Sequence, residues 1–265
     1  MKYSFMSFSC PELTFQGMLD AARQYRYDGI EPRMLRKHAH GVELESSSDK
    51  RQSIRKQAEE SGIDICCVAT SCRYADPDSS AENVEQTLRA IDLAADIGSP
   101  RLRVFGGTMG KDLSRDDAVK LVAESLSLCA DRAAVRDVTI CVETHDDWCH
   151  PSDVVAVMKA ADHPNIAVNW DIMHPVQQEF ATMSESYEML KPWIKHVHFH
   201  DGATIDGKNH LVPVGEGNID HKTALKALAD ESWDGYMSGE WIGWTPWEAH
   251  LPVEIQTMKN YEKTL

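Results

Sequence analysis

The sequence predicts a protein of the α/β class, a (β/α)8 TIM barrel in which eight parallel strands are surrounded by outer helices. Short apolar runs rich in β-branched residues alternate with longer segments of helical periodicity along the whole chain, eight of each. The length of 265 residues agrees with this fold, because such barrels commonly contain roughly 250 residues. We therefore expect one barrel domain that spans residues 1–265.

The expected strands and helices follow one another in regular alternation. The strands are Tyr3–Ser9, Gly29–Arg33, Ile63–Ala69, Leu102–Phe105, Val138–Glu143, Ile166–Asp171, Ile194–His200 and Tyr236–Trp241. The helices are Thr14–Tyr25, Asp49–Ser61, Ser80–Ile97, Ser114–Val135, Pro151–Ala161, Met183–Leu190, His221–Glu231 and Glu248–Tyr261. Ser114 is suited to cap a helix N-terminus, and Gly62 and Gly98 are suited to end helices. The turn after the first strand lacks a G-x-G-x-x-G motif, which argues against an open dinucleotide-binding sheet.

Composition and charge narrow the class of function. The chain has 42 acidic and 27 basic residues and a net charge of −15, which argues against binding to nucleic acid. No apolar run is long enough to cross a membrane, and the N-terminus does not resemble a signal peptide. The seven cysteines include no C-x-x-C pair, as is typical of reduced, buried thiols. These features predict a cytoplasmic protein.

Four consecutive expected strands end in a residue that can bind a metal ion, namely Glu143, Asp171, His198 and Glu240. Neighbouring strands lie about 4.8 Å apart, so these side chains converge at the C-terminal end of the barrel. Three carboxylates so close together repel one another unless a cation neutralises them. Oxygen ligands with one imidazole suit a divalent ion, with Mn²⁺ preferred and Mg²⁺, Co²⁺, Fe²⁺ and Zn²⁺ as alternatives.

With these residues the sequence resembles the xylose-isomerase-like barrels of the sugar phosphate isomerase/epimerase superfamily. The resemblance covers the C-terminal half and one earlier segment. Its motifs are GIEPR (29–33), ETH (143–145), D-x-x-H (171–174), VHFHD (197–201), VGEGNID (214–220) and GYMSGEW (235–241). The resemblance implies that the four strand-end residues bind the metal and that both glutamates also transfer protons. It further implies that His174 contacts the substrate.

The sequence departs from the family pattern at two places. Many relatives have a lysine two positions after the metal-binding histidine, where this chain has His200. The segment Gly202–Val212, expected to be a loop, also lacks the arginine that ketohexose epimerases have there. These departures bear on how the substrate is bound, and not on the four ligands.

Further candidates surround the expected metal site. His145 follows Glu143 by two residues and is suited to general acid–base catalysis, although a solvated loop histidine explains it equally well. Arg103 either binds substrate oxygens or pairs with a core carboxylate. Glu31 can be a buried acid behind the metal ligands. The expected catalytic residues are thus Glu143, Glu240 and His145, and the expected substrate-binding residues are His174, His200 and Arg103.

The expected reaction is removal of a proton next to a carbonyl, with the ene-diolate stabilised by the metal. We expect an isomerase or epimerase of a sugar. The alternative is a lyase or dehydratase acting on a keto-sugar, a keto-inositol or a dehydroshikimate-like compound. Apurinic endonucleases share this barrel, but they need about three metals and a DNA-binding surface. A non-catalytic sugar- or metal-binding module is the remaining alternative. Trp241, Trp244 and Trp247 are suited to a subunit contact, which would give a homodimer or homotetramer.

Overall fold

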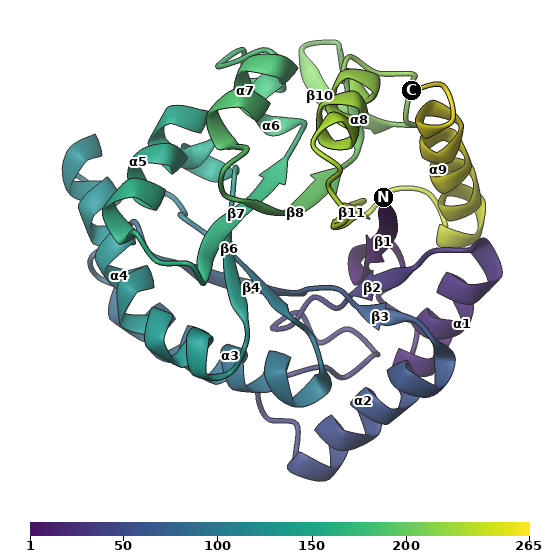
Figure 1. Cartoon of the computed structure of the whole chain (residues 1–265), viewed down its shortest axis with the longest axis horizontal. Coiled ribbons are helices and arrows are strands. Elements are labelled where there is room, and N and C mark those ends of the chain that lie inside the picture. Colours follow the sequence, from purple (N-terminus) through teal and green to yellow (C-terminus); the bar gives the residue numbers. More distant parts are fainter.

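Nine parallel strands form the inner layer of the molecule, and helices surround them (Figure 1). The computed structural model describes residues 1–265 and gives the strand order β3-β2-β1-β11-β8-β7-β6-β5-β4. A bridge between Arg33 and Ala69 joins the β2 side of this order to β4, and Met34 N donates to Ala69 O at 3.0 Å. The predicted TIM-barrel fold is therefore confirmed.

The strands and helices alternate along the chain as the sequence predicts, except that no helix separates β3 from β4, two helices follow β7, and a hairpin follows β8. The strands of the barrel are β1 (Lys2–Met6), β2 (Gly29–Glu31), β3 (Asp64–Ile65), β4 (Val68–Arg73), β5 (Arg101–Phe105), β6 (Thr139–Glu143), β7 (Ile166–Asp171), β8 (Ile194–Phe199) and β11 (Tyr236–Gly239). The helices are α1 (Phe15–Tyr25), α2 (Ser48–Ser61), α3 (Ser80–Ile97), α4 (Arg115–Val135), α5 (Pro151–Ala161), α6 (His174–Gln177), α7 (Met183–Leu190), α8 (His221–Asp230) and α9 (Trp247–Glu262). Two short 3-10 turns, η1 (Ser7–Ser9) and η2 (Asp146–Trp148), follow β1 and β6.

The third predicted strand, Ile63–Ala69, is wrong in its extent. The chain forms β3, which pairs with β2, and then β4, which pairs with β5 and continues to Arg73. The register of β4 shifts between Ala69 and Arg73. At this shift Thr70 Oγ1 donates to Arg103 O at 2.9 Å and accepts from Cys72 N at 3.0 Å. The Thr70 side chain thus makes hydrogen bonds that a regular ladder would make through the backbone.

The predicted loop Gly202–Val212 is instead an antiparallel hairpin of β9 (Asp201–Ile205) and β10 (Lys208–Val212). Its turn consists of Asp206 and Gly207, which have φ angles of 51° and 72°. A two-residue turn with positive φ at both positions favours Asp-Gly, because the left-handed conformation costs little at these residues. The hairpin begins directly after β8, and Figure 1 shows β10 at the rim of the molecule between α7 and α8.

Alternation along the strands makes the barrel interior polar and its outer surface apolar. In β8, His196 and His198 are buried inside the barrel, whereas Val197 and Phe199 belong to the apolar core beneath the helices. In β7, Trp170 faces outward and its Nε1 donates to Ser186 Oγ of α7 at 2.9 Å. Because side chains alternate between faces with period two, every second residue of these strands faces the centre. The fold therefore collects charged side chains inside the barrel.

Several local predictions are confirmed. Ser114 caps α4, since its Oγ accepts from Asp117 N at 3.1 Å. Gly62 and Gly98 end α2 and α3 with φ angles of 69° and 84°. All seven cysteines are buried and unpaired. None of the helices has the length and apolar character that crossing a bilayer requires.

Candidate metal centre

The four residues that end consecutive strands come together at the C-terminal end of the barrel. One ligand atom from each lies within 4.8 Å of those of the others, and all four side chains are buried. Asp171 pairs in register with His198, and His198 pairs with Ser238, two residues before Glu240. The four side chains thus converge because their strands are hydrogen-bonded neighbours. The set is Glu143, Asp171, His198 and Glu240.

His198 presents its two ring nitrogens to opposite sides. Its Nδ1 lies 2.7 Å from Glu143 Oε1 and 3.3 Å from Glu240 Oε2. Its Nε2 lies 3.2 Å from both carboxylate oxygens of Glu31. Metal-binding histidines commonly direct one nitrogen to the ion and the other to a carboxylate that orients the ring. His198 has this arrangement, with Glu31 on the far side from the cluster.

The charges of the cluster fit a divalent cation. Burial disfavours a charged His198, but the carboxylates of Glu31 and Glu143 outweigh burial and raise its pKa well above the ordinary value. Burial acts in the opposite direction on Glu240, yet His198 and Arg103 lower its pKa to about 2. Glu143 Oε2 is buried without a hydrogen-bond partner. The site therefore brings three buried carboxylates and one imidazole together, and these residues could hold a metal ion.

Asp171, the last residue of β7, is held by backbone N–H groups at the start of α6 and by two histidines. Its Oδ1 accepts from Met173 N at 2.8 Å and from His174 N at 3.3 Å, at the start of α6. His200 Nε2 lies 2.9 Å from Asp171 Oδ2, and His174 Nε2 lies 3.7 Å from the same oxygen. Burial raises the pKa of Asp171, but His174 and His200 reverse this effect and lower it. Both predicted substrate-binding histidines thus lie against a candidate metal ligand.

Arg103 pairs with the core carboxylates and also reaches the cavity above them. Its Nε lies 3.3 Å from Glu143 Oε2, and its Nη2 lies 4.0 Å from Glu240 Oε1. Its Nη1 donates to Thr70 O at 2.9 Å. The guanidinium stacks on the ring of Phe105 at 4.0 Å. The two roles considered for Arg103 are therefore compatible in this geometry.

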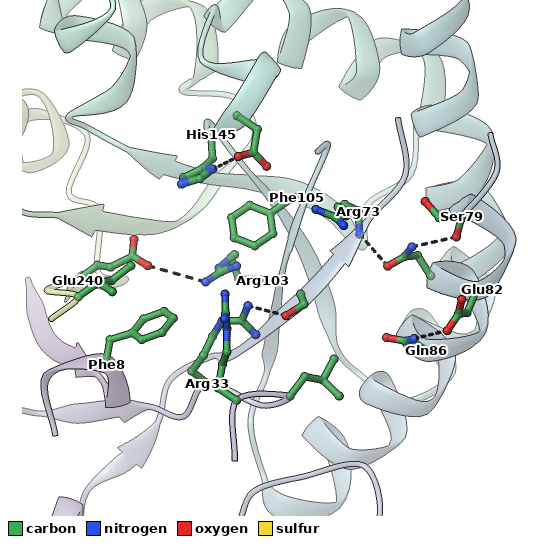
Figure 2. A pocket seen from close by; sticks show the side chains of 16 residues that line it. Phe8, Arg33, Arg73, Ser79, Glu82, Gln86, Arg103, Phe105, His145 and Glu240 are labelled. Carbon is green, nitrogen blue, oxygen red and sulfur yellow. Dashed lines mark hydrogen bonds and ion pairs between the residues drawn. The ribbon is translucent and has the colours of Figure 1, made fainter. Parts of the chain in front are cut away.

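A cavity of about 590 Å³ opens next to the cluster, within the range of small-molecule sites (Figure 2). Arg103, His145 and Glu240 line it, whereas Glu143, His174 and His200 are not among its lining residues. The sequence therefore identifies some of the side chains that face this space. Of the predicted residues that do not line the cavity, His174 and His200 lie against Asp171, and Glu143 lies against Arg103.

His145 is held at the edge of the cavity by Asp146 and by an edge-to-face contact with the ring of His174. Its Nδ1 lies 2.8 Å from Asp146 Oδ1, and its ring centroid lies 4.5 Å from that of His174. Burial disfavours its charged form, but Asp146 and Glu143 outweigh this effect and raise its pKa to about 9. His145 is thus neither fully solvated nor free, and its geometry provides a proton donor at the cavity wall.

The sequence model of the xylose isomerase-like TIM barrel family matches residues 19–261. The chain belongs to this family. Among its relatives, 3-dehydroshikimate dehydratase from Bacillus anthracis is 23% identical, and the match covers 98% of this chain and 97% of that protein. The relatives of this family therefore include a lyase of similar length.

Solved structures of other xylose isomerase-like barrels have the same fold. L-ribulose 3-epimerase superposes with a TM-score of 0.81 at 18% identity, over 100% of this chain and 95% of that chain. The IOLI protein, whose crystal structure has a bound zinc atom, superposes with a TM-score of 0.78 at 18% identity. That superposition covers 98% of this chain and 96% of that chain. These likenesses concern the fold.

Three arginines near the site were not selected from the sequence. Arg33, Arg36 and Arg73 line the same cavity as Arg103. Arg33 belongs to the GIEPR segment, where its place directly after a strand is a signal that could have identified it. Arg73 lies beyond the expected end of its strand at Ala69, so the sequence pattern alone did not bring it to the cavity.

Proposed function

We propose that this xylose isomerase-like barrel is a divalent-metal-dependent enzyme that removes a proton from the carbon next to a carbonyl. The substrate is a small polyhydroxylated ketone. The observation that carries this proposal is the position of Glu143 and Glu240, which approach the same nitrogen of His198 at 2.7 and 3.3 Å. Two carboxylates that share one cation site can bind the ion and exchange protons with a substrate beside it.

Glu143, Asp171, His198 and Glu240 would hold the ion, and we propose Mn²⁺, with Mg²⁺, Co²⁺, Fe²⁺ and Zn²⁺ as alternatives. Bound there, a divalent cation supplies the positive charge that stabilises ene-diolate oxygens. Glu31 orients His198 from behind. Arg103 adds a fixed positive charge next to both glutamates. The protein thus supplies a preorganised cationic environment for an anionic transition state.

The lining of the cavity supports an assignment of proton-transfer roles. Glu240 and His145 both line the cavity, whereas Glu143 lies behind Arg103 and is not among its lining residues. We therefore propose that Glu240 removes the proton from carbon and that His145 returns one. Return to the opposite face of the same carbon gives epimerisation, and return to the adjacent carbon gives isomerisation. We propose an isomerase or epimerase on this basis.

A second candidate is dehydration of a keto compound. The relative matched over nearly the whole chain is named as a dehydratase. In that reaction the electron pair left by the departing proton expels a β-hydroxyl, which takes a proton from His145 and leaves as water. The contact with Asp146 at 2.8 Å favours a protonated His145, the form that such a step requires.

Proton NMR in D₂O separates these reactions, using a panel of ketoses and keto-acids with Mn²⁺ added. We expect an α-proton to be replaced by deuterium, and Glu240→Gln to slow this exchange strongly. A product of unchanged formula identifies an isomerase or epimerase, whereas loss of water identifies a dehydratase. Tight metal binding without exchange on any compound would instead support a binding module. Glu188→Gln, on the exposed face of α7, serves as the control for the substitution itself.

A further inference from the structure

Arginines gather on one wall of the cavity in a chain that is strongly acidic overall. The net charge is −15, yet Arg33, Arg36, Arg73 and Arg103 all line this space. Arg103 pairs with Glu143 and Glu240. The other three arginines line the cavity without an ion pair to any carboxylate of the chain. Figure 2 shows Arg33 next to Arg103, and Arg73 next to Phe105.

Arg33 is the only buried residue of these three unpaired arginines. Its side chain is 2% exposed. Nη1 donates to Met34 O at 2.6 Å and Nη2 donates to Ser71 Oγ at 2.7 Å, but Nε is buried without a partner. Burial and the neighbouring Arg103 and Arg36 lower the pKa of Arg33 to about 9. A buried cation with only neutral partners is unfavourable, and an anion placed beside it would relieve that cost.

Ser71 and Arg73 extend the same wall. The bridge between Arg33 and Ala69 sets the end of β2 beside β4, so Arg33 lies next to the strand that carries Ser71 and Arg73. Both side chains line the cavity together with Arg33. This wall therefore combines two guanidinium groups and a hydroxyl within one recess, which is a common way to bind an anion.

The carboxylates on the cavity wall are already engaged elsewhere. Glu82 accepts from Gln86 Nε2 at 3.1 Å, and Asp146 lies 2.8 Å from His145 Nδ1. Glu240 faces His198 at 3.3 Å. None of these acids forms an ion pair with Arg33 or Arg73. Asp146 interacts with Arg73, and Glu240 with Arg33, only through longer-range electrostatics, so the guanidinium groups of this wall have no carboxylate in direct contact.

We propose that Arg33, Ser71 and Arg73 form a subsite for a carboxylate group of the substrate, so that the substrate is a hydroxylated keto-acid and not a neutral sugar. This inference rests on the proposed function, because it places the carbonyl end of the same molecule at the metal centre. Two oxygens of a planar carboxylate match the fork of the exposed Arg73 guanidinium. The negative charge of that carboxylate would also compensate the buried charge of Arg33, whose Nη atoms are held by Met34 and Ser71.

Isothermal titration calorimetry of the Mn²⁺-loaded protein tests this subsite with three probes that share one carbon chain. The probes are D-gluconate, neutral D-glucitol and D-glucitol 6-phosphate. We expect gluconate to bind about tenfold more tightly than glucitol, because one charge-assisted hydrogen bond contributes roughly the free energy of a tenfold change in affinity. Arg33→Gln and Arg73→Gln should each reduce this preference, and Arg89→Gln should not, because Arg89 lies on the outside of α3 beside Glu45.

The outcomes decide the inference separately from the proposed function. Equal binding of gluconate and glucitol, or an unchanged preference in Arg73→Gln, would overturn the subsite. Tighter binding of the phosphate than of gluconate would overturn the carboxylate assignment. Arg73 is exposed, so its variant remains informative if Arg33→Gln fails to fold. A carboxylate preference without deuterium exchange on any substrate would contradict only the proposed reaction, and exchange without the preference would contradict only the subsite.

Discussion

Glu31 holds both of its carboxylate oxygens 3.2 Å from Nε2 of His198, on the side of the ring opposite Glu143. One of these oxygens also lies 2.8 Å from His196 Nε2. A single buried acid thus orients two histidines of β8. Because the carboxylate fixes which His198 nitrogen points toward the cluster, Glu31 orients a candidate metal ligand without being one of the four clustered residues itself.

Glu31→Gln should weaken metal binding about 10- to 100-fold, as loss of such an outer partner typically does. The amide keeps the shape of the side chain but removes the charge that stabilises a proton or a metal on His198. Equilibrium dialysis with Mn²⁺ measures the effect. Glu59→Gln, on the exposed face of α2, is the matched control. Unchanged affinity in the Glu31 variant would show that the carboxylate only supports packing.

His145→Asn should leave Mn²⁺ affinity nearly unchanged and slow turnover about 10²- to 10⁴-fold, the range typical of losing a general acid or base. His145 lines the cavity but is not one of the four clustered ligands. Metal affinity by dialysis and turnover by NMR give the two readings. A parallel loss of both would indicate that His145 supports the metal centre, and full turnover would remove its proposed role.

Much of this site follows from local sequence patterns. Strand periodicity and strand ends are local properties, so Glu143, Asp171 and Glu240 could be placed without knowing the rest of the fold. The contact of Glu31 with His198 joins residues 167 positions apart, and depends on how the barrel brings β2 and β8 into reach of each other. Sequence reasoning therefore suggested a buried acid at Glu31 but not its partner.

The arginine wall shows what sequence patterns leave out. Arg73 reaches the cavity because β4 shifts its register near Thr70, and no feature of apolar periodicity reports such a shift. The hairpin of β9 and β10 is different, since Asp206-Gly207 is a recognised hairpin signal within the sequence. The position of Arg73 could be found only from the tertiary structure, whereas the hairpin could have been predicted from the sequence.

Thr70→Val should lower the free energy of unfolding by about 1–3 kcal/mol, because Arg103 O and Cys72 N would lose their buried partner. Thr70→Ser keeps the hydroxyl and should cost about 1 kcal/mol for the lost methyl group. Urea denaturation of the two variants makes the comparison. If both variants lost the same free energy of unfolding, the packing of the Thr70 side chain, and not its hydrogen bonds, would stabilise the register shift of β4.

Because of Glu254 in α9, we expect the free energy of unfolding to fall as the pH rises from 4.5 to about 7. Burial, opposed by the hydrogen bond from Val214 N at 2.9 Å, raises its pKa to about 7. The folded protein therefore holds this proton more tightly than the unfolded chain does, and the benefit present below the unfolded pKa of 4.5 is lost as the pH passes 7.

Glu254→Gln removes this titration while it keeps an oxygen that can accept from Val214 N. Between about pH 5 and about pH 8, wild-type stability should fall by roughly 2–3 kcal/mol more than that of the variant. Urea denaturation of both proteins at the two pH values measures this difference in free energy of unfolding. The titration of all other groups affects both proteins equally and therefore cancels in the comparison. Parallel pH profiles would mean that Glu254 stays ionised in the folded protein, with water or Val214 N compensating for its burial.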